Sequence, residues 1–256
     1  MDGYLPVPGA RLYYEVRGDG PALLISQSGE GDAGRTADLV VRLADTYTVI
    51  TYDRRGLSRS TLDDPAAGAT MAEHADDVQR LLAQLTDGPA HMLGCSFGAV
   101  LGLHLAVRHP GRLATLIAHE PVAPALLPDA DRRHHEEELV ELQRVYRERG
   151  LEGAFGKIAE VLGIRPGEQE AEPDLTPHPM DDRRRANFDF FIRNGPGQPS
   201  GSGVRPSRAR RRSKRGASPG TVRAGRKAAP GRRRRSSSGT ARAIGQAAST
   251  RSGSGT

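Results

Sequence analysis

The stretch His91-Met-Leu-Gly-Cys-Ser-Phe-Gly98 decides the fold class of this chain of 256 residues. Its first four residues form a short apolar run typical of a buried strand, and residues 99–107 continue with the apolar content of a helix. Ser96 lies between the two, with Gly94 and Gly98 on either side of it. Glycine permits strained backbone and close approach. The stretch therefore predicts a strand, a sharp turn that carries a serine hydroxyl, and a helix.

The segments on both sides repeat this alternation of strand and helix. Short apolar or β-branched runs at 22–26, 47–52 and 113–118 are typical of buried strands. Residues 71–85 carry one apolar stripe at helical spacing, and residues 11–16 alternate like one strand of a hairpin. Strands that alternate with helices indicate an α/β class, with a mostly parallel sheet flanked by helices.

The pattern changes twice along the chain. From Pro128 to Phe191 it becomes helical and charge-rich, which is typical of an inserted lid. We therefore divide the chain into an α/β core over 1–127, a helical lid or cap region over 128–194, and a low-complexity basic tail over 195–256.

The tail differs from the rest of the chain in charge and in apolar content. Residues 197–256 hold 16 of the 37 basic residues and none of the 31 acidic ones, so residues 1–196 have a net charge of −10. The sequence pI of about 9.9 therefore comes from the tail. The tail has no aromatic residue and no leucine. Such a segment buries too little apolar surface to offset the entropy of ordering it, so we expect it to be disordered.

Two hypotheses account for the tail. Its abundant Arg, Gly, Ala and Pro are encoded by GC-only codons, so a change of reading frame near Asn194-Gly195 in GC-rich DNA would produce it. Alternatively, residues 208–212 and 232–235 form a polybasic arm that binds nucleic acid by counterion release. The frame change is favoured because the tail begins where further strands are expected. A sheet that ends there exposes an unpaired edge, which predicts poor solubility.

The remaining composition excludes several classes of protein. The amino terminus lacks a basic segment followed by an apolar run, and nowhere do eighteen apolar residues follow one another, so we expect a cytoplasmic protein without a membrane partner. Cys95 is the single cysteine, which rules out an intramolecular disulfide and a Cys-x-x-Cys metal site. No metal or cofactor is expected. We interpret Cys95 as a small buried residue rather than a nucleophile.

Two motifs connect the chain to a known family. Gly94-Cys-Ser-Phe-Gly98 matches G-x-S-x-G, and Asp53-Arg-Arg-Gly-Leu-Ser-Arg-Ser60 is similar to D-x-R-G-x-G-x-S. In this order they resemble the α/β-hydrolase superfamily, specifically its serine-nucleophile members of the AB hydrolase-1 type, over about residues 4–193. The resemblance implies an α/β-hydrolase fold, here incomplete, that hydrolyses an ester or related bond of a small-molecule substrate. A serine nucleophile argues against relatives that use aspartate instead.

The resemblance also implies roles for individual residues. Ser96 is the expected nucleophile, and Gly94 and Gly98 make room for it at the elbow. The N–H of Phe97 is expected to be one donor of the oxyanion hole. The second donor is expected from the loop after Ile25, where Ser28 and Gly29 are the candidates.

The sequence departs from the family pattern at the general base and its orienting acid. The family's histidine follows the last strand, whereas no histidine of this chain lies beyond His178 and the tail has no acidic residue. Activity is therefore expected to be impaired. Glu120 follows a strand on the expected side of the sheet and is the candidate acid, and His119 is the candidate replacement base. For Glu120, the alternative is a structural capping or pairing role.

Two further alternatives remain open. The arginines of residues 53–60 either bind an anion or pin their own loop by internal hydrogen bonds, and the second is favoured. The alternative to catalysis is a binding protein with a polybasic tail. A nucleic-acid partner is expected only if that tail is genuine.

Overall fold

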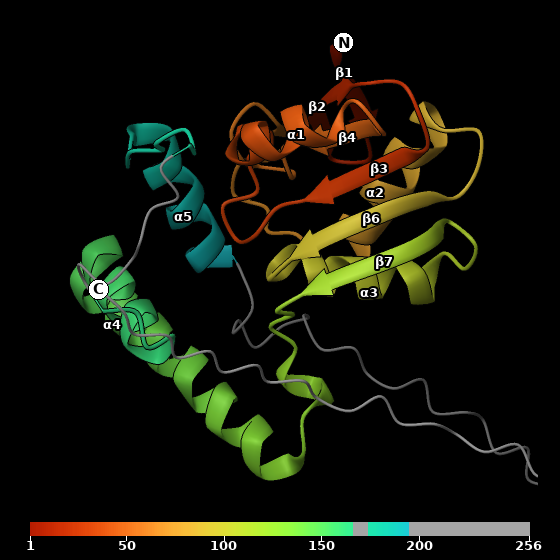
Figure 1. Cartoon of the computed structure of the whole chain (residues 1–256). Helices are drawn as coiled ribbons and strands as arrows, with labels where there is room; N and C mark the ends of the chain where they lie inside the picture. The colour runs from red at the N-terminus through yellow and green to blue at the C-terminus, as the bar shows by residue number, and fades with distance from the viewer. Residues whose placement is uncertain (166–173, 195–256) are drawn as a thin grey trace, which may run out of the picture. The chain divides into compact units, whose positions relative to one another are not determined.

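Residues 1–165 and 174–194 are described by the structure, which is a computed structural model of the chain. All of them belong to one unit, residues 1–206, whose sheet and helices are drawn in colour in Figure 1. The predicted tail, the polybasic arm and the proposed change of frame fall outside the described residues.

A seven-stranded sheet forms the centre of this unit. Its main path has the order β1-β2-β4-β3-β6-β7, and β5 pairs with β2 beside that path. β4, β3, β6 and β7 run parallel to one another along this path, whereas β2 pairs antiparallel with both β1 and β4. The strands are β1 (Asp2–Val7), β2 (Ala10–Arg17), β3 (Ala22–Ser26), β4 (Thr48–Tyr52), β5 (Thr61–Leu62), β6 (Ala90–Cys95) and β7 (Leu113–His119).

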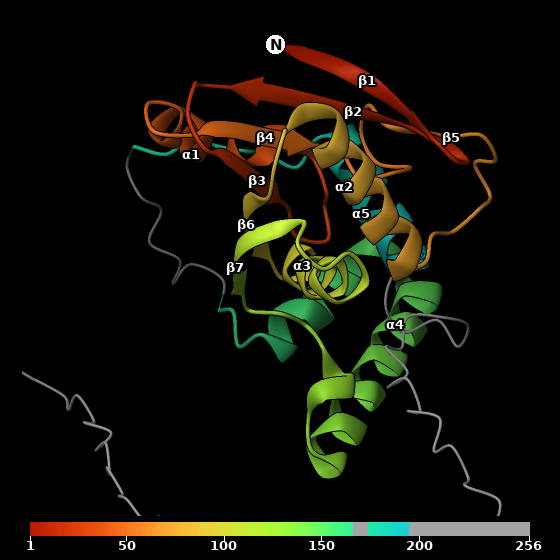
Figure 2. The same cartoon turned by 90° about the vertical axis from the view of Figure 1, so that its right-hand side faces the viewer.

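Helices cover both faces of this sheet, as the alternating pattern predicts. On one face α2 and α3 pack around Leu24, Ile50 and Met92, and Figure 2 shows these two helices together. On the other face α1 packs with Val40 against Val49 and its neighbours. The helices are η1 (Ala33–Thr36), α1 (Ala37–Leu43), α2 (Met71–Leu85), α3 (Phe97–Arg108), η2 (Pro124–Leu126), α4 (Asp129–Val161) and α5 (Asp182–Asn194).

Local sequence explains where α2 begins. Thr70 and Glu73 form a capping box, in which each side chain accepts a hydrogen bond from the other residue's backbone N–H. The buried stripe of the helix includes Ala75, Val78 and Leu82, three and four residues apart. Cap and stripe are both readable in the sequence, and the helix has the predicted bounds.

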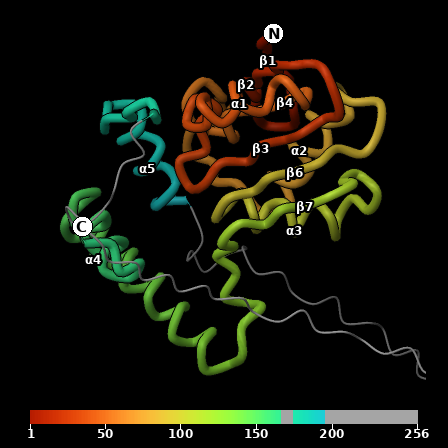
Figure 3. Tube along the Cα trace, in the orientation of Figure 1, coloured from red at the N-terminus to blue at the C-terminus, as the bar shows by residue number. Residues whose placement is uncertain are grey.

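In the region predicted as a lid, the described residues form the two helices α4 and α5. α4 changes direction at Gly150, whose φ of 65° ends one helix and allows a second to begin. Figure 3 follows the chain from β7 through α4 and back along α5 to the carboxyl ends of the strands. The side chain of Gln143 donates to the carbonyl oxygen of Ile192, which joins α4 to α5. That these helices act as a lid stays a prediction.

β7 is an edge strand within the described part of the chain. It pairs with β6 along one side, and no other described strand pairs with it. Its side chains are half-buried or exposed on both faces, and Ile117 is 58% exposed. The expectation of an unpaired edge where the tail begins stays a prediction, because the tail lies outside the described residues. No described helix combines the length and apolarity needed to cross a membrane.

Candidate active site

The turn between β6 and α3 places Ser96 in a strained backbone conformation. Its φ is 51° and its ψ is −112°, and β6 ends and α3 begins at its immediate neighbours. A residue other than glycine at positive φ stores strain, which is concentrated at functional sites. The predicted order of strand, sharp turn and helix is confirmed.

The two glycines of the turn are required by close packing. A Cβ on Gly94 would lie 2.4 Å from the carbonyl oxygen of Gly98, and a Cβ on Gly98 would lie 2.2 Å from that of Ser26. Both distances are far below van der Waals contact, and the opposing atoms are backbone. Only glycine fits at either position. The contact of Gly98 with Ser26 also brings the turn directly against the end of β3.

Backbone N–H groups without a hydrogen-bond partner occur on both sides of this contact. The N–H of Phe97 is among the first of α3 and therefore has no partner within the helix. The N–H groups of Ser28 and Gly29 donate no hydrogen bond to any residue in the described ranges. Unpaired donors beside a nucleophile can bind an anionic oxygen. The expected oxyanion residues therefore come from two loops that pack together.

Arg54 is buried beneath the loop that follows β3. It is 3% exposed, and its guanidinium donates hydrogen bonds to the carbonyl oxygens of Gln27, Ser28 and Gly29. Burial lowers the pKa of Arg54 to about 10, because water no longer solvates its charge. Its guanidinium carbon lies 4.3 Å from the ring centroid of Phe97.

The other arginines of residues 53–60 hold their own loop in place. Arg59 forms an ion pair with the buried Asp53, with Nε and Oδ2 2.7 Å apart. Arg55 binds Asp77 through two hydrogen bonds of 2.7 and 2.6 Å. Burial raises the pKa of Asp77 more than Arg55 lowers it. The loop is therefore pinned by an internal ion pair, as the favoured interpretation holds, and also by hydrogen bonds to α2.

Helix α5 contributes residues that the sequence analysis did not single out. A Cβ on Gly29 would lie 2.5 Å from Phe191, whose ring also meets that of Phe97 edge-on at 5.5 Å. The amide of Asn187 both accepts from the N–H of Ser58 and donates to its hydroxyl. Three of the five phenylalanines fall within residues 188–191, a signal that could have identified this cluster.

The predicted acid and base lie at the end of β7. The N–H of Ser96 donates to the carbonyl oxygen of His119 over 2.9 Å, so the two strand ends are adjacent. The side chain of Glu120 is 81% exposed, and one of its oxygens is 3.9 Å from Nδ1 of His119. That nitrogen lies 3.8 Å from the sulfur of Cys95. Within the described ranges neither side chain hydrogen-bonds to the Ser96 hydroxyl.

The surroundings of two other titratable side chains near the turn, Cys95 and His74, favour structural roles over catalytic ones. Burial raises the pKa of the Cys95 thiol, whereas a reactive cysteine needs a lowered one. His74 is buried with its ring edge-on to that of Phe97 at 5.4 Å, and burial lowers its pKa well below the usual value. No three His, Cys, Asp or Glu side chains of the described residues gather in a way that could hold a metal ion.

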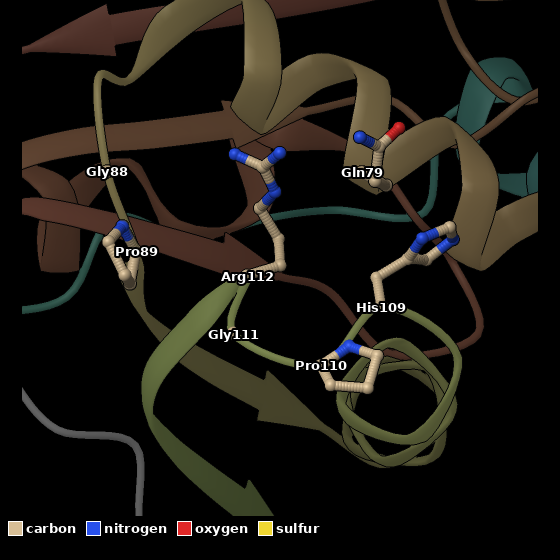
Figure 4. A pocket seen from close by; sticks show the side chains of 7 residues that line it. All are labelled: Gln79, Gly88, Pro89, His109, Pro110, Gly111 and Arg112. Carbon is tan, nitrogen blue, oxygen red and sulfur yellow. The ribbon is translucent and has the colours of Figure 1, made fainter.

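A cavity of about 330 Å³ lies at the other end of the sheet. Figure 4 shows its lining, where Arg112 and Pro89 precede strands β7 and β6, and His109 follows α3. Ligand sites of open α/β sheets form at the carboxyl ends of the strands, where Ser96 lies. This cavity is therefore separate from the candidate site.

Comparisons with known proteins agree with this geometry. The family model described as alpha/beta hydrolase fold matches residues 21–166. YraK of Bacillus subtilis, an uncharacterized hydrolase, is 43% identical over 146 residues, which are 57% of this chain and 54% of YraK. The chain spans about half the length of the curated relatives it matches.

Solved structures show the same fold at lower identity. An esterase from Exiguobacterium antarcticum has a TM-score of 0.55 at 21% identity, covering 76% of this chain and 73% of that protein. An alpha/beta hydrolase from Sphaerobacter thermophilus has a TM-score of 0.50 at 23% identity, covering 75% and 70%. The strand, turn and helix at Ser96 agree with the family match over residues 21–166. The chain therefore belongs to the alpha/beta hydrolase fold family.

Proposed function

We propose that the chain cleaves a small ester, or a related acyl bond, through an acyl-enzyme on Ser96. One observation carries the proposal: Ser96 is strained at the turn into α3, the N–H of Phe97 next to it has no partner within the helix, and the N–H groups of Ser28 and Gly29 have none among the described residues. A strained turn exposes a nucleophile, and unpaired donors stabilise the negative oxygen that forms when it attacks. That YraK is a hydrolase supports the same reaction type.

The proposed chemistry has two steps. In the first, Oγ of Ser96 forms a bond to the acyl carbon, the ester C–O bond breaks, and the alcohol leaves. The hydroxyl proton passes to a base, and the N–H groups of Phe97 and of Ser28 or Gly29 donate to the oxyanion. In the second, water adds to the acyl carbon and releases the acid and free Ser96.

The substrate class follows from the rings around these donors. Phe191 lies against Gly29 and meets Phe97 edge-on, and both rings are carried next to expected oxyanion residues. These rings present apolar surface, and the guanidinium of Arg54 already lies against both of them. We therefore propose a small substrate with an uncharged acyl group.

Acylation with an activated ester tests the proposal. The purified chain is mixed with p-nitrophenyl acetate, release of p-nitrophenolate is followed, and the modified peptide is located by mass spectrometry. We expect one acetyl group per chain on Ser96 and none in Ser96→Ala. Cys95→Ala is the matched control, one residue from the nucleophile, and should still be acetylated. Equal labelling of Ser96→Ala and the unchanged chain would refute the proposal.

The base is tested in the same assay. His119 and Glu120 are the local candidates for base and orienting acid. A positioned general base contributes about 10²- to 10⁴-fold. Because His119 makes no hydrogen bond to the Ser96 hydroxyl in the described ranges, we expect His119→Ala to slow acetylation less than about tenfold. A larger loss, matched by Glu120→Gln, would instead assign them as base and acid.

A further inference from the structure

Arg54 differs from the other arginines of its loop in having no acidic partner. Arg55 and Arg59 form ion pairs with carboxylates, whereas no carboxylate of the described residues lies within ion-pair distance of Arg54. Yet Arg54 is among the most buried arginines of the described chain, at 3% exposure. An unpaired buried charge opposes folding unless other groups compensate it. Its surroundings therefore point to a use other than stability.

Carbonyl oxygens of one loop take the place of the missing carboxylate. Nη1 of Arg54 lies 2.6 Å from the oxygen of Ser28 and 3.3 Å from that of Gln27, and Nη2 lies 2.6 Å from that of Gly29. These are three successive residues after β3. One planar guanidinium thus fixes three successive peptide groups of the expected oxyanion loop.

The direction of these carbonyls determines the direction of the neighbouring N–H groups. In a planar trans peptide, the N–H of one residue points opposite to the C=O of the residue before it. Because the oxygens of Gln27 and Ser28 point to Arg54, the N–H groups of Ser28 and Gly29 point away from it. Neither N–H donates to another described residue. Arg54 therefore holds both donors outward and unpaired.

The same guanidinium also contacts the nucleophile turn and helix α5. Its carbon lies 4.3 Å from the ring centroid of Phe97 and 5.7 Å from that of Phe191, within cation–π range. Phe97 carries the other expected donor of the oxyanion hole. Arg54 thus contacts the Ser28–Gly29 loop and both of these rings.

We propose that Arg54 is the positioning residue of the oxyanion hole, and that it orients the N–H groups of Ser28 and Gly29 against the turn at Ser96. This inference rests on the proposed function, since it concerns the same acylation step. The positive charge of Arg54 also lies behind the loop where the oxyanion forms, and it favours that negative charge through the peptide dipoles.

Two substitutions of Arg54 separate the effect of its positive charge from the effect of its planar guanidinium. Arg54→Lys keeps the positive charge but loses the planar fork, and Arg54→Met keeps much of the side-chain volume and loses both. Arg11→Met is the matched control, because Arg11 is exposed and stacks on Tyr4 at 3.9 Å without touching the site. The readouts are the acetylation rate of Ser96 at saturating p-nitrophenyl acetate, the half-saturating concentration, and hydrogen exchange of residues 27–31.

We expect acetylation to slow about tenfold in Arg54→Lys and about 100-fold in Arg54→Met, as for a displaced oxyanion donor. The half-saturating concentration should stay within about twofold, because the loss falls on the transition state. Exchange of residues 27–31 should accelerate in both variants at the Gly31 amide, which donates to the Ser28 carbonyl that Arg54 holds. Arg11→Met should match the unchanged chain in every readout.

The outcomes distinguish this inference from the proposed function. Unchanged acetylation and unchanged exchange in Arg54→Lys would overturn the positioning role, and this variant decides alone if Arg54→Met does not fold. A change in melting temperature without a change in rate or exchange would also overturn it. If the unchanged chain is not acetylated at Ser96, the proposed function fails. Faster exchange confined to residues 27–31 would then still support Arg54 as the residue that orients the loop.

Discussion

Ser96, the proposed nucleophile, has a strained backbone conformation. Its positive φ costs free energy that an ordinary turn would not require, on the order of 1–3 kcal/mol. The surrounding glycines make that conformation sterically accessible, and the sheet on one side and α3 on the other maintain it. The strain is therefore stabilised by regular structure around the site.

The first prediction concerns Gly98. Gly98→Ala places a Cβ 2.2 Å from the backbone oxygen of Ser26, so β3 and the turn must separate. We expect a loss of about 1–3 kcal/mol in the free energy of unfolding, measured by urea denaturation. Gly88→Ala is the control, because nothing lies within 4 Å of its Cβ, and it should stay within about 0.5 kcal/mol. Equal effects of the two would show that the turn relaxes freely.

At the scale of elements, buried ion pairs join the loop after β4 to helix α2. Arg55 reaches Asp77 of α2, which is 2% exposed. Burial raises the pKa of Asp77, whereas the hydrogen bonds to Asp77 raise the pKa of Arg55. Desolvation and mutual attraction therefore oppose each other in this pair. We predict that the pair specifies how loop and helix meet more than it adds net stability.

A double substitution tests whether the Arg55–Asp77 pair adds net stability. Arg55→Met leaves Asp77 buried without its cation, and we expect it to lower the free energy of unfolding by about 3–5 kcal/mol. Asp77→Leu added to Arg55→Met should restore most of that loss, because no buried charge remains. Thermal and urea unfolding of the single and double variants measure this. A double variant as unstable as Arg55→Met would mean that the pair itself contributes the stability.

At the scale of the whole molecule, the feature with the largest expected effect on solution behaviour is strand β7, whose outer edge pairs with no other described strand. The strand carries no charge on its exposed residues before His119, and Ile117 is exposed there. An uncharged edge without proline presents unpaired backbone groups to a second chain. Self-association through this edge is the expected physical consequence for the described part of the chain.

Charge placed on this edge should reduce self-association. Ile117→Lys puts an ammonium group on the strand, which opposes edge-to-edge pairing. We expect a lower weight-average mass by light scattering across a concentration series. Val107→Lys, a change at an exposed valine of α3, adds the same charge away from the edge and should have little effect. A monodisperse monomer before any substitution would contradict the expectation.

Local patterns determined most of the fold in advance. The run at residues 22–26 and the stripe at 71–85 become β3 and α2 with the same bounds, because a strand run, a cap and a helical stripe are all local in sequence. Ser96 and its glycines were identified for the same reason. The motif that marks this turn is local in sequence, although the contacts that maintain its strain are not.

The residues that surround Ser96 in space were decided by the tertiary structure alone. Asn187 and Ser58 are 129 residues apart yet share two hydrogen bonds, and Phe191 packs on Gly29. Nothing in local spacing distinguishes Arg54, which faces three carbonyl groups, from Arg55 beside it, which faces a carboxylate. Such contacts depend on how α5 and two loops meet in space. A sequence pattern records periodicity along the chain, whereas burial and partner choice are set by packing between distant segments.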